Sequence, residues 1–317
     1  MLSRIVSLFC ALPVLAAQEP EAIFRSNTRL VLLHATVIDK NGSLMTNLGR
    51  DAFTVFENNI AQQLKVFRRE DVPVSLGLVV DNSGSMRDKR KKVESAALAL
   101  IKASNPEDEV FIVNFNDDAW LDVEFTRDIK VMEEGITKID SRGGTAMRDA
   151  VSMSIDYLKK EGKKDKKILL IITDGNDNTS TTTLERLVGK VQQTEIVVYS
   201  IGLLSEEERG EARKAKRALD AITHASGGQP YYPKEAEEVD KMSLQVAHEI
   251  RSQYVLAYTP SEQALDGTFR QIRVTVKGPN RPVARTRTGY YATRDQAPPK
   301  TPALSPAKPT SANSVRP

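Results

Sequence analysis

Two strongly apolar runs, at residues 76–80 and 168–173, constrain the fold of this chain more than any other feature. Each run is continuous rather than alternating, which is typical of a strand buried on both faces of a parallel sheet. The first run ends at Asp81 and the second ends at Asp174. Because parallel sheets bind ligands outside the carboxyl ends of their strands, we expect both carboxylates at the binding edge of one sheet.

The surrounding segment, residues 73–250, alternates between strand and helix patterns. After the first run, apolar residues follow helical spacing at Val93, Ala96, Ala97, Leu100 and Ile101, with basic residues between them. Further strands are predicted at 110–115, 120–125 and 195–201, and further helices at 128–139, 206–225 and 235–251. This alternation predicts an α/β domain with a mostly parallel sheet flanked by helices, in which residues 120–125 form an antiparallel edge.

The flanking segments, residues 22–72 and 253–293, have β patterns instead. Alternating or β-branched runs occur at 30–38, 53–57 and 63–67 before the α/β segment, and at 254–258, 270–276 and 287–292 after it. Each flank holds too few strands for an independent sandwich. We therefore expect the two flanks to form one small β-sandwich-like domain into which the α/β domain is inserted.

The two ends of the chain are predicted to lie outside these domains. Residues 1–17 have a basic N-terminus, an apolar core and two small residues at the end, which is the pattern of a signal peptide with its cleavage region. The apolar core is too short for a helix that spans a membrane. The single cysteine, Cys10, lies inside it, so the mature chain is expected to have no disulfide in its secreted or periplasmic location. Residues 294–317 contain six prolines and are predicted to be a disordered tail.

Composition excludes some partners. A 40% hydrophobic and 27% charged chain is typical of a soluble globular protein, and the formal net charge of +3 is too small to argue for nucleic acid or an anionic membrane. No stretch after the predicted signal peptide is long and apolar enough to span a bilayer.

The sequence DNSGS at 81–85 supplies the first chemical signal. It offers the carboxylate of Asp81 and the hydroxyls of Ser83 and Ser85 at alternating positions, with Gly84 easing a tight turn. An all-oxygen set suits a hard divalent cation rather than zinc or copper. Asp and Ser before a helix are also ordinary N-caps, so these five residues alone leave both interpretations open.

Three motifs together favour the metal-site interpretation over simple N-capping. DNSGS at 81–85, GGT at 143–145 and ITDG at 172–175 resemble the three loops of a von Willebrand factor type A domain. The resemblance implies a Rossmann-like fold and a metal-ion-dependent adhesion site. By resemblance, Mg²⁺, with Mn²⁺ and Ca²⁺ as alternatives, would bind to Asp81, Ser83, Ser85, Thr145 and Asp174. The flanks also resemble those of secreted bacterial proteins that carry this type of domain.

A competing calcium site is weaker. Asp174, Asn176, Asn178 and Glu185 match four positions of an EF-hand loop. However, Thr179 stands where that loop requires glycine, and a strand rather than a helix leads into it. We interpret this match as a coincidence.

Enzymatic alternatives fit poorly. Ser83 stands where an aspartyl-phosphate hydrolase would carry its second aspartate, and the chain has no Walker phosphate-binding motif. The three histidines, His34, His224 and His248, fall within strand or helix patterns that indicate packing or surface positions. We therefore predict a non-enzymatic binding module that engages a carboxylate of a protein partner through its metal. An envelope scaffold with a purely structural metal is the first alternative, and a metal-dependent hydrolase is the second.

Overall fold

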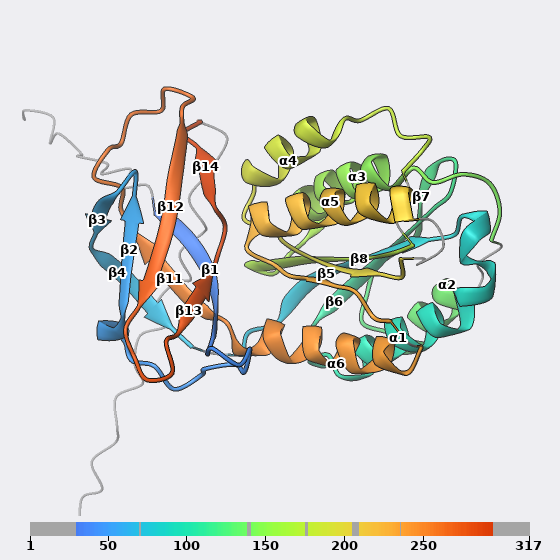
Figure 1. Cartoon of the computed structure of the whole chain (residues 1–317), viewed down its shortest axis with the longest axis horizontal. Coiled ribbons are helices and arrows are strands. Elements are labelled where there is room, and N and C mark those ends of the chain that lie inside the picture. Colours follow the sequence, from blue (N-terminus) through green and yellow to red (C-terminus); the bar gives the residue numbers. More distant parts are fainter. Residues whose placement is uncertain are drawn as a thin grey trace, which may run out of the picture.

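The computed structural model describes residues 30–69, 71–137, 141–174, 177–204, 209–234 and 236–293. The predicted signal peptide, the proline-rich tail and Asn176 lie outside these residues. The described chain contains one six-stranded sheet and two four-stranded sheets (Figure 1).

The six-stranded sheet forms the centre of the α/β domain. Its strand order is β10-β9-β8-β5-β6-β7, and every pairing is parallel except that of β7 with β6. The strands are β5 (Val74–Asp81), β6 (Glu109–Phe115), β7 (Ala119–Thr126), β8 (Lys166–Thr173), β9 (Val197–Gly202) and β10 (Pro230–Tyr231). Every residue of β5 is buried, as its continuous apolar run predicts. The antiparallel edge predicted at 120–125 is confirmed as β7.

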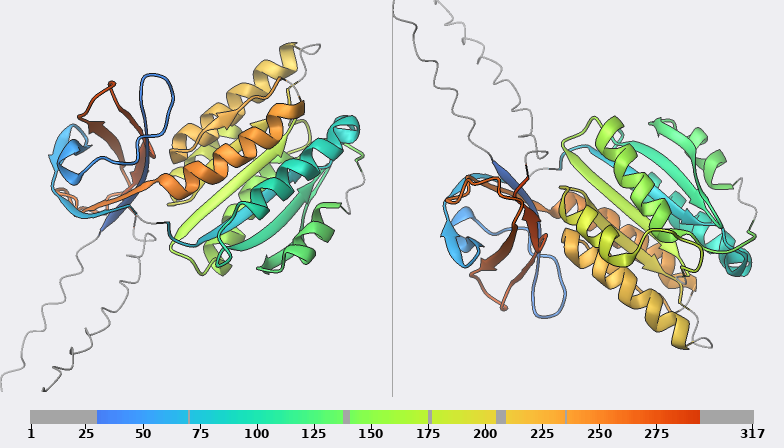
Figure 2. Two further views of the ribbon diagram at one scale, coloured as in Figure 1. Left: turned by 90° about the horizontal axis from the view of Figure 1, so that it is seen from below. Right: turned by 90° about the horizontal axis from the view of Figure 1, so that it is seen from above.

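Helices cover both faces of this sheet, as Figures 1 and 2 show. One apolar core joins the sheet to α1 (Arg90–Lys102), α2 (Ile129–Thr137) and α6 (Ala236–Ser252). A second core joins it to α3 (Met147–Glu161), α4 (Leu184–Gln192) and α5 (Arg209–Ser226). The five apolar positions predicted in α1 are all buried. The domain is therefore a Rossmann-like α/β layer structure, as predicted.

Strands from the two flanks interleave in the other two sheets. The first has the order β13-β1-β11-β4 and the second has the order β14-β12-β2-β3. The N-terminal flank supplies β1 (Val31–Ile38), β2 (Phe53–Glu57), β3 (Ile60–Gln62) and β4 (Leu64–Arg68). The C-terminal flank supplies β11 (Tyr254–Tyr258), β12 (Phe269–Val276), β13 (Val283–Arg285) and β14 (Gly289–Tyr291). One apolar core contains residues from both flanks, which makes the unit a β sandwich.

The structure also differs from the sequence-based expectation in a few elements. The helix predicted from the spacing of Val93 to Ile101 is α1, which begins at Arg90 and is preceded by a short 3₁₀ helix, η2 (Gly84–Lys89). A second 3₁₀ helix, η1 (Arg50–Ala52), precedes β2. Helix α4 and the short strands β3, β10 and β13 were not predicted.

Buried polar contacts join the sandwich to the α/β domain. Nη2 of Arg285 donates to both carboxylate oxygens of Glu249 at 2.9 Å, and the Glu249 side chain is only 3% exposed. The Tyr231 hydroxyl donates to the same carboxylate at 2.6 Å. The Gln253 amide, directly after α6, donates to the Tyr199 hydroxyl at 3.1 Å. The junction is therefore a packed interface with a buried ion pair.

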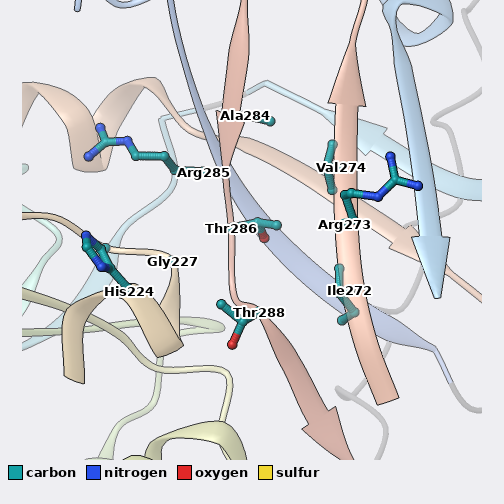
Figure 3. Close-up of a pocket in the computed structure, with 10 residues that line it drawn as sticks. His224, Gly227, Ile272, Arg273, Val274, Ala284, Arg285, Thr286 and Thr288 are labelled. Carbon is teal, nitrogen blue, oxygen red and sulfur yellow. The ribbon is translucent and has the colours of Figure 1, made fainter. Parts of the chain in front are cut away.

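A cavity of about 210 Å³ lies at this junction, between the end of α5 and strands β12 and β13 (Figure 3). His224 and Thr288 lie on its lining. The guanidinium groups of Arg273 and Arg285 lie on opposite sides of this cavity. Arg273 stacks over the Phe56 ring, and Arg285 forms an ion pair with Glu249. Its two cations are therefore already engaged by other groups.

Candidate metal site

The first predicted ligand, Asp81, lies at the carboxyl end of β5 and is 2% exposed. Its Oδ2 accepts a hydrogen bond of 2.6 Å from the Thr173 hydroxyl at the end of β8. Its Oδ1 accepts a hydrogen bond of 2.8 Å from the backbone N–H of Ser83, which tightens the loop after the strand. Asp81 is thus fixed between two adjacent parallel strands and its own loop.

The two serines and Asp174 lie together beside it. The hydroxyls of Ser83 and Ser85 are 3.2 Å apart, and the Ser85 hydroxyl donates to Asp174 Oδ1 at 3.0 Å. Ser83 occupies the N-cap position of η2, but its side chain makes no capping hydrogen bond. The simple capping interpretation therefore does not account for the Ser83 hydroxyl, which faces another oxygen instead.

Backbone contacts hold the second loop against the first. The N–H of Gly84 donates to the carbonyl of Gly143 at 3.1 Å, and the N–H of Arg142 donates to the carbonyl of Asn82 at 3.0 Å. Thr145 follows this loop and is 4% exposed. Among the described residues, its hydroxyl has no hydrogen bond to the other four predicted ligands. The structure thus brings Thr145 to this edge of the sheet through its backbone.

The segment after Asp174 supports the second loop and α3. The Asn178 side-chain oxygen accepts from the backbone N–H of Thr145 at 2.9 Å. Asp177 accepts from the backbone N–H of Arg148 at 2.7 Å and pairs with its guanidinium at 2.9 Å. Glu185 lies in the first turn of α4. Asn178 and Asp177 are therefore engaged in holding neighbouring backbone, which agrees with the interpretation of the EF-hand match as a coincidence.

Two residues beside the site carry contacts that the sequence did not indicate. The Lys89 ammonium lies 3.0 Å from Asp174 Oδ2, with side-chain exposures of 28% and 7%. Asp117 accepts from the N–H of Gly144 at 2.7 Å. An ideal Cβ on Gly143, whose φ is +75°, would lie 2.1 Å from Asp117, so this position requires glycine. Lys89 and Asp117 come from segments far from their partners in sequence, and no local pattern marks them.

The charge balance of the cluster suits a cation. Burial and, after it, the nearby Asp174 carboxylate together raise the pKa of Asp81 to about 6, against the hydrogen bonds from Ser83 and Thr173 that lower it. Within the described ranges, no group of three or more His, Cys, Asp or Glu side chains is placed to hold a metal. Two carboxylates and neighbouring hydroxyls fit a hard divalent cation such as Mg²⁺, which prefers oxygen ligands.

A family model for the von Willebrand factor type A domain matches residues 76–176, the segment that contains all five predicted ligands. Together with the Rossmann-like sheet, this match shows that the chain contains a von Willebrand factor type A domain. Domains of this family are in general non-enzymatic protein-interaction modules.

Two curated relatives match part of the chain. An uncharacterized protein of Synechocystis sp. is 28% identical over 136 residues, which are 41% of this chain and 32% of the relative. The inter-alpha-trypsin inhibitor heavy chain H4 of Bos taurus is 24% identical over 123 residues, which are 35% of this chain and 13% of the relative. The chain therefore spans about a third or less of the length of these relatives.

Among solved structures, a von Willebrand factor type A protein from Catenulispora acidiphila is similar, with a TM-score of 0.48 and 12% identity. The similarity covers 86% of this chain and 76% of that one. None of the helices in the described part of the chain combines the length and apolar character needed to cross a bilayer.

Proposed function

We propose that this protein is an exported binding module that uses a divalent cation, Mg²⁺ in the first place, to engage a carboxylate of a protein partner. The proposed ligands are Asp81, Ser83, Ser85, Thr145 and Asp174. The observation that carries the proposal is the contiguous oxygen cluster of two carboxylates and two serine hydroxyls at the carboxyl edge of the sheet.

The charge count supports a site that remains attractive to an acid. Once the Lys89 ammonium is displaced from Asp174, two carboxylates balance the charge of a divalent ion without excess, and the hydroxyls add neutral oxygen ligands. A bound cation would supply a positive centre with a position open to an anionic oxygen. The protein's own contacts would keep the ligands of such a cation in place, because Asp81 is held by Thr173 and Ser83 while the Gly84–Gly143 contact joins the first two loops.

Metal binding is tested by thermal unfolding across a magnesium titration, with Asp81→Ala as the variant. Binding to the folded state alone stabilises it by about 2.7 kcal/mol at a hundredfold excess over the dissociation constant. We expect this gain in the wild type and its loss in Asp81→Ala. Asp156→Ala, which removes an exposed carboxylate of α3 away from the cluster, is the control and should keep the gain. A wild-type melting temperature that does not change with magnesium would contradict the proposal.

Partner binding is tested by pull-down from an envelope extract with and without chelator, followed by affinity measurements on the captured protein. Losing one polar contact to a charged centre costs about 1.5–3 kcal/mol, or roughly ten- to a hundredfold in affinity. We expect Thr145→Ala to weaken partner binding by this factor and to change magnesium affinity less. If Thr145→Ala instead lowers the melting temperature and leaves partner affinity intact, the metal is structural and the scaffold alternative replaces this proposal.

The proposed export rests on the signal-peptide pattern of residues 1–17. Expression of the full chain in a secreting bacterium should yield a mature protein that lacks this segment. Mass spectrometry of the exported and retained fractions measures the outcome, and an intact N-terminus on all of the protein would contradict export by this route.

A further inference from the structure

A groove of about 460 Å³ opens at the carboxyl end of β9, and four cationic side chains line it. Arg209, Arg213 and Lys216 follow one face of α5 at spacings of four and three residues, and Lys234 comes from the loop after β10. Tyr232 forms one wall. We call these five residues the basic groove. We propose that it binds a second acidic side chain of the same partner segment whose first acid engages the metal, an inference that rests on the proposed function.

Within the part of the chain that the structure describes, three of the four cationic side chains of the basic groove have no acidic partner. Lys216 pairs with Asp220 at 2.9 Å and stands 4.3 Å from the centre of the Tyr232 ring. Arg209, Arg213 and Lys234 form no side-chain hydrogen bond or ion pair with another residue that the structure describes. Three exposed cations around one groove attract anions, and guanidinium groups match carboxylates in geometry.

The wall of the groove is fixed in place. An ideal Cβ on Gly202 would lie 2.9 Å from the Tyr232 ring, so the ring packs directly against the backbone of β9. The Tyr232 hydroxyl donates to Asp220 at 2.7 Å, which holds the other end of the ring. The groove therefore has a rigid aromatic side, against which the aliphatic part of an acidic side chain can pack.

The groove also lies next to the candidate metal site. Gly202 pairs with Thr173 across β9 and β8, and the N–H of Leu203 donates to the carbonyl of Thr173 at 2.9 Å. Asp174 follows Thr173 directly, and neighbouring strands lie about 4.8 Å apart. An extended partner segment advances about 3.3 Å per residue, so acids two or four positions apart lie about 7–13 Å from each other on the same side. We therefore expect a segment with two acids at one of these spacings to reach both places.

The occupant that fits is an acidic protein segment rather than a nucleic acid. The chain as a whole carries a net charge of only +3, and the four cations of the groove form a local cluster beside the candidate metal site. A polyphosphate backbone requires a longer basic track, since each contact neutralises one phosphate of an extended chain.

Labelled extended peptides test the inference by fluorescence anisotropy in magnesium and in EDTA. The peptides carry one glutamate, or two glutamates separated by one or three residues. Exposed ion pairs contribute up to about fivefold each, so we expect a di-acidic peptide to bind the wild type about three- to tenfold more tightly than the mono-acidic one. Arg209→Gln combined with Arg213→Gln should abolish this preference and leave mono-acidic binding unchanged. Lys214→Gln combined with Arg217→Gln removes the same charge from α5 outside the groove lining and should retain the preference.

The outcomes separate this inference from the proposed function. Magnesium-dependent binding with no preference for two acids would overturn the groove inference alone. Di-acid binding that persists in EDTA, or no binding of any peptide, would overturn both. Equal competition by a single-stranded oligonucleotide would show a general anion site and would also overturn the inference.

Discussion

Replacing Lys89 by methionine should make the candidate site bind magnesium more tightly. The Lys89 ammonium lies 3.0 Å from Asp174 Oδ2, while the Ser85 hydroxyl occupies the other oxygen of the same carboxylate. A cation that uses Asp174 must therefore compete with this ammonium. The substitution removes the competitor and keeps an apolar stem of similar length.

The magnitude follows from the exposure of the ion pair. Its side chains are 28% and 7% exposed, so solvent screens the pair in part. A pair of this kind contributes about 0.5–1 kcal/mol. Lys89→Met should lose this stability in EDTA, and its dissociation constant for magnesium should fall by about two- to fivefold. Thermal unfolding in EDTA and calorimetric titration with magnesium measure the two quantities.

Arg87→Met is the matched control, because it removes the same charge from the same 3₁₀ helix. Its guanidinium contacts the Ser141 carbonyl at 3.4 Å rather than a carboxylate of the site. The gain in magnesium affinity should be larger for Lys89→Met than for Arg87→Met. Equal gains would mean that only the general loss of charge matters, and weaker magnesium binding in Lys89→Met would refute the competition argument.

Three further predictions concern stability. Burial, reinforced by the charges of Lys166 and Arg287, lowers the pKa of His34 from 6.5 to about 3. Between pH 3 and pH 6.5, His34 therefore binds a proton in the unfolded chain but not in the folded chain. The unfolding free energy should therefore fall by up to about 1.4 kcal/mol per pH unit as the pH drops from about 6.5 toward 3. Urea unfolding at several pH values should show a weaker dependence of this free energy on pH for His34→Phe than for the wild type. Gly77→Ala should cost about 1–3 kcal/mol without changing magnesium affinity, because its Cβ would lie 2.4 Å from the Phe111 ring; an unchanged urea midpoint would contradict this. Glu249→Leu should cost about 3 kcal/mol by leaving Arg285 unpaired, and adding Arg285→Met should recover most of the loss in a double-mutant cycle, whereas additive losses would show that the pair is not coupled.

Elements with a strong local period could be predicted from the sequence. The continuous apolar runs of β5 and β8 and the helical spacing of α1 depend only on neighbouring residues, and all three occur as expected. Helix α4 has only nine residues and buries only Leu187 and Val191, so its helical period is weak in the sequence. Strand β13 has only three residues, too few for any period to be visible.

The residue types of the candidate site could also be predicted from the sequence, whereas its contacts with distant residues could not. The residue types of the three loops can be recognised in the sequence, and hydrogen bonds connect Asp81 to Ser83, Ser83 to Ser85 and Ser85 to Asp174. The contacts that hold these loops and helix α3 in place cannot be recognised in the sequence. Helix α3 has Ala146 at its N-cap, where no side chain can cap, and the distant Asp177 accepts from its first turn instead. Capping rules apply to adjacent residues and cannot find such a partner.

The course of β5 separates the candidate metal site from the sandwich. The strand enters the sheet from the connection to β4 and runs eight residues to Asp81, a distance of about 26 Å at the usual rise per residue. The other connection, from α6 to β11, also lies at the sandwich end (Figures 1 and 2). The oxygen cluster and the basic groove therefore face away from the sandwich, at the opposite edge of the sheet. The Glu249–Arg285 pair, the Gln253 contact and the hydrogen bond from the Thr288 N–H to the Ala225 carbonyl of α5 fix the junction. Any influence of the sandwich on the cluster must therefore pass through the sheet or through helices that reach the junction, such as α5 and α6, rather than by direct contact.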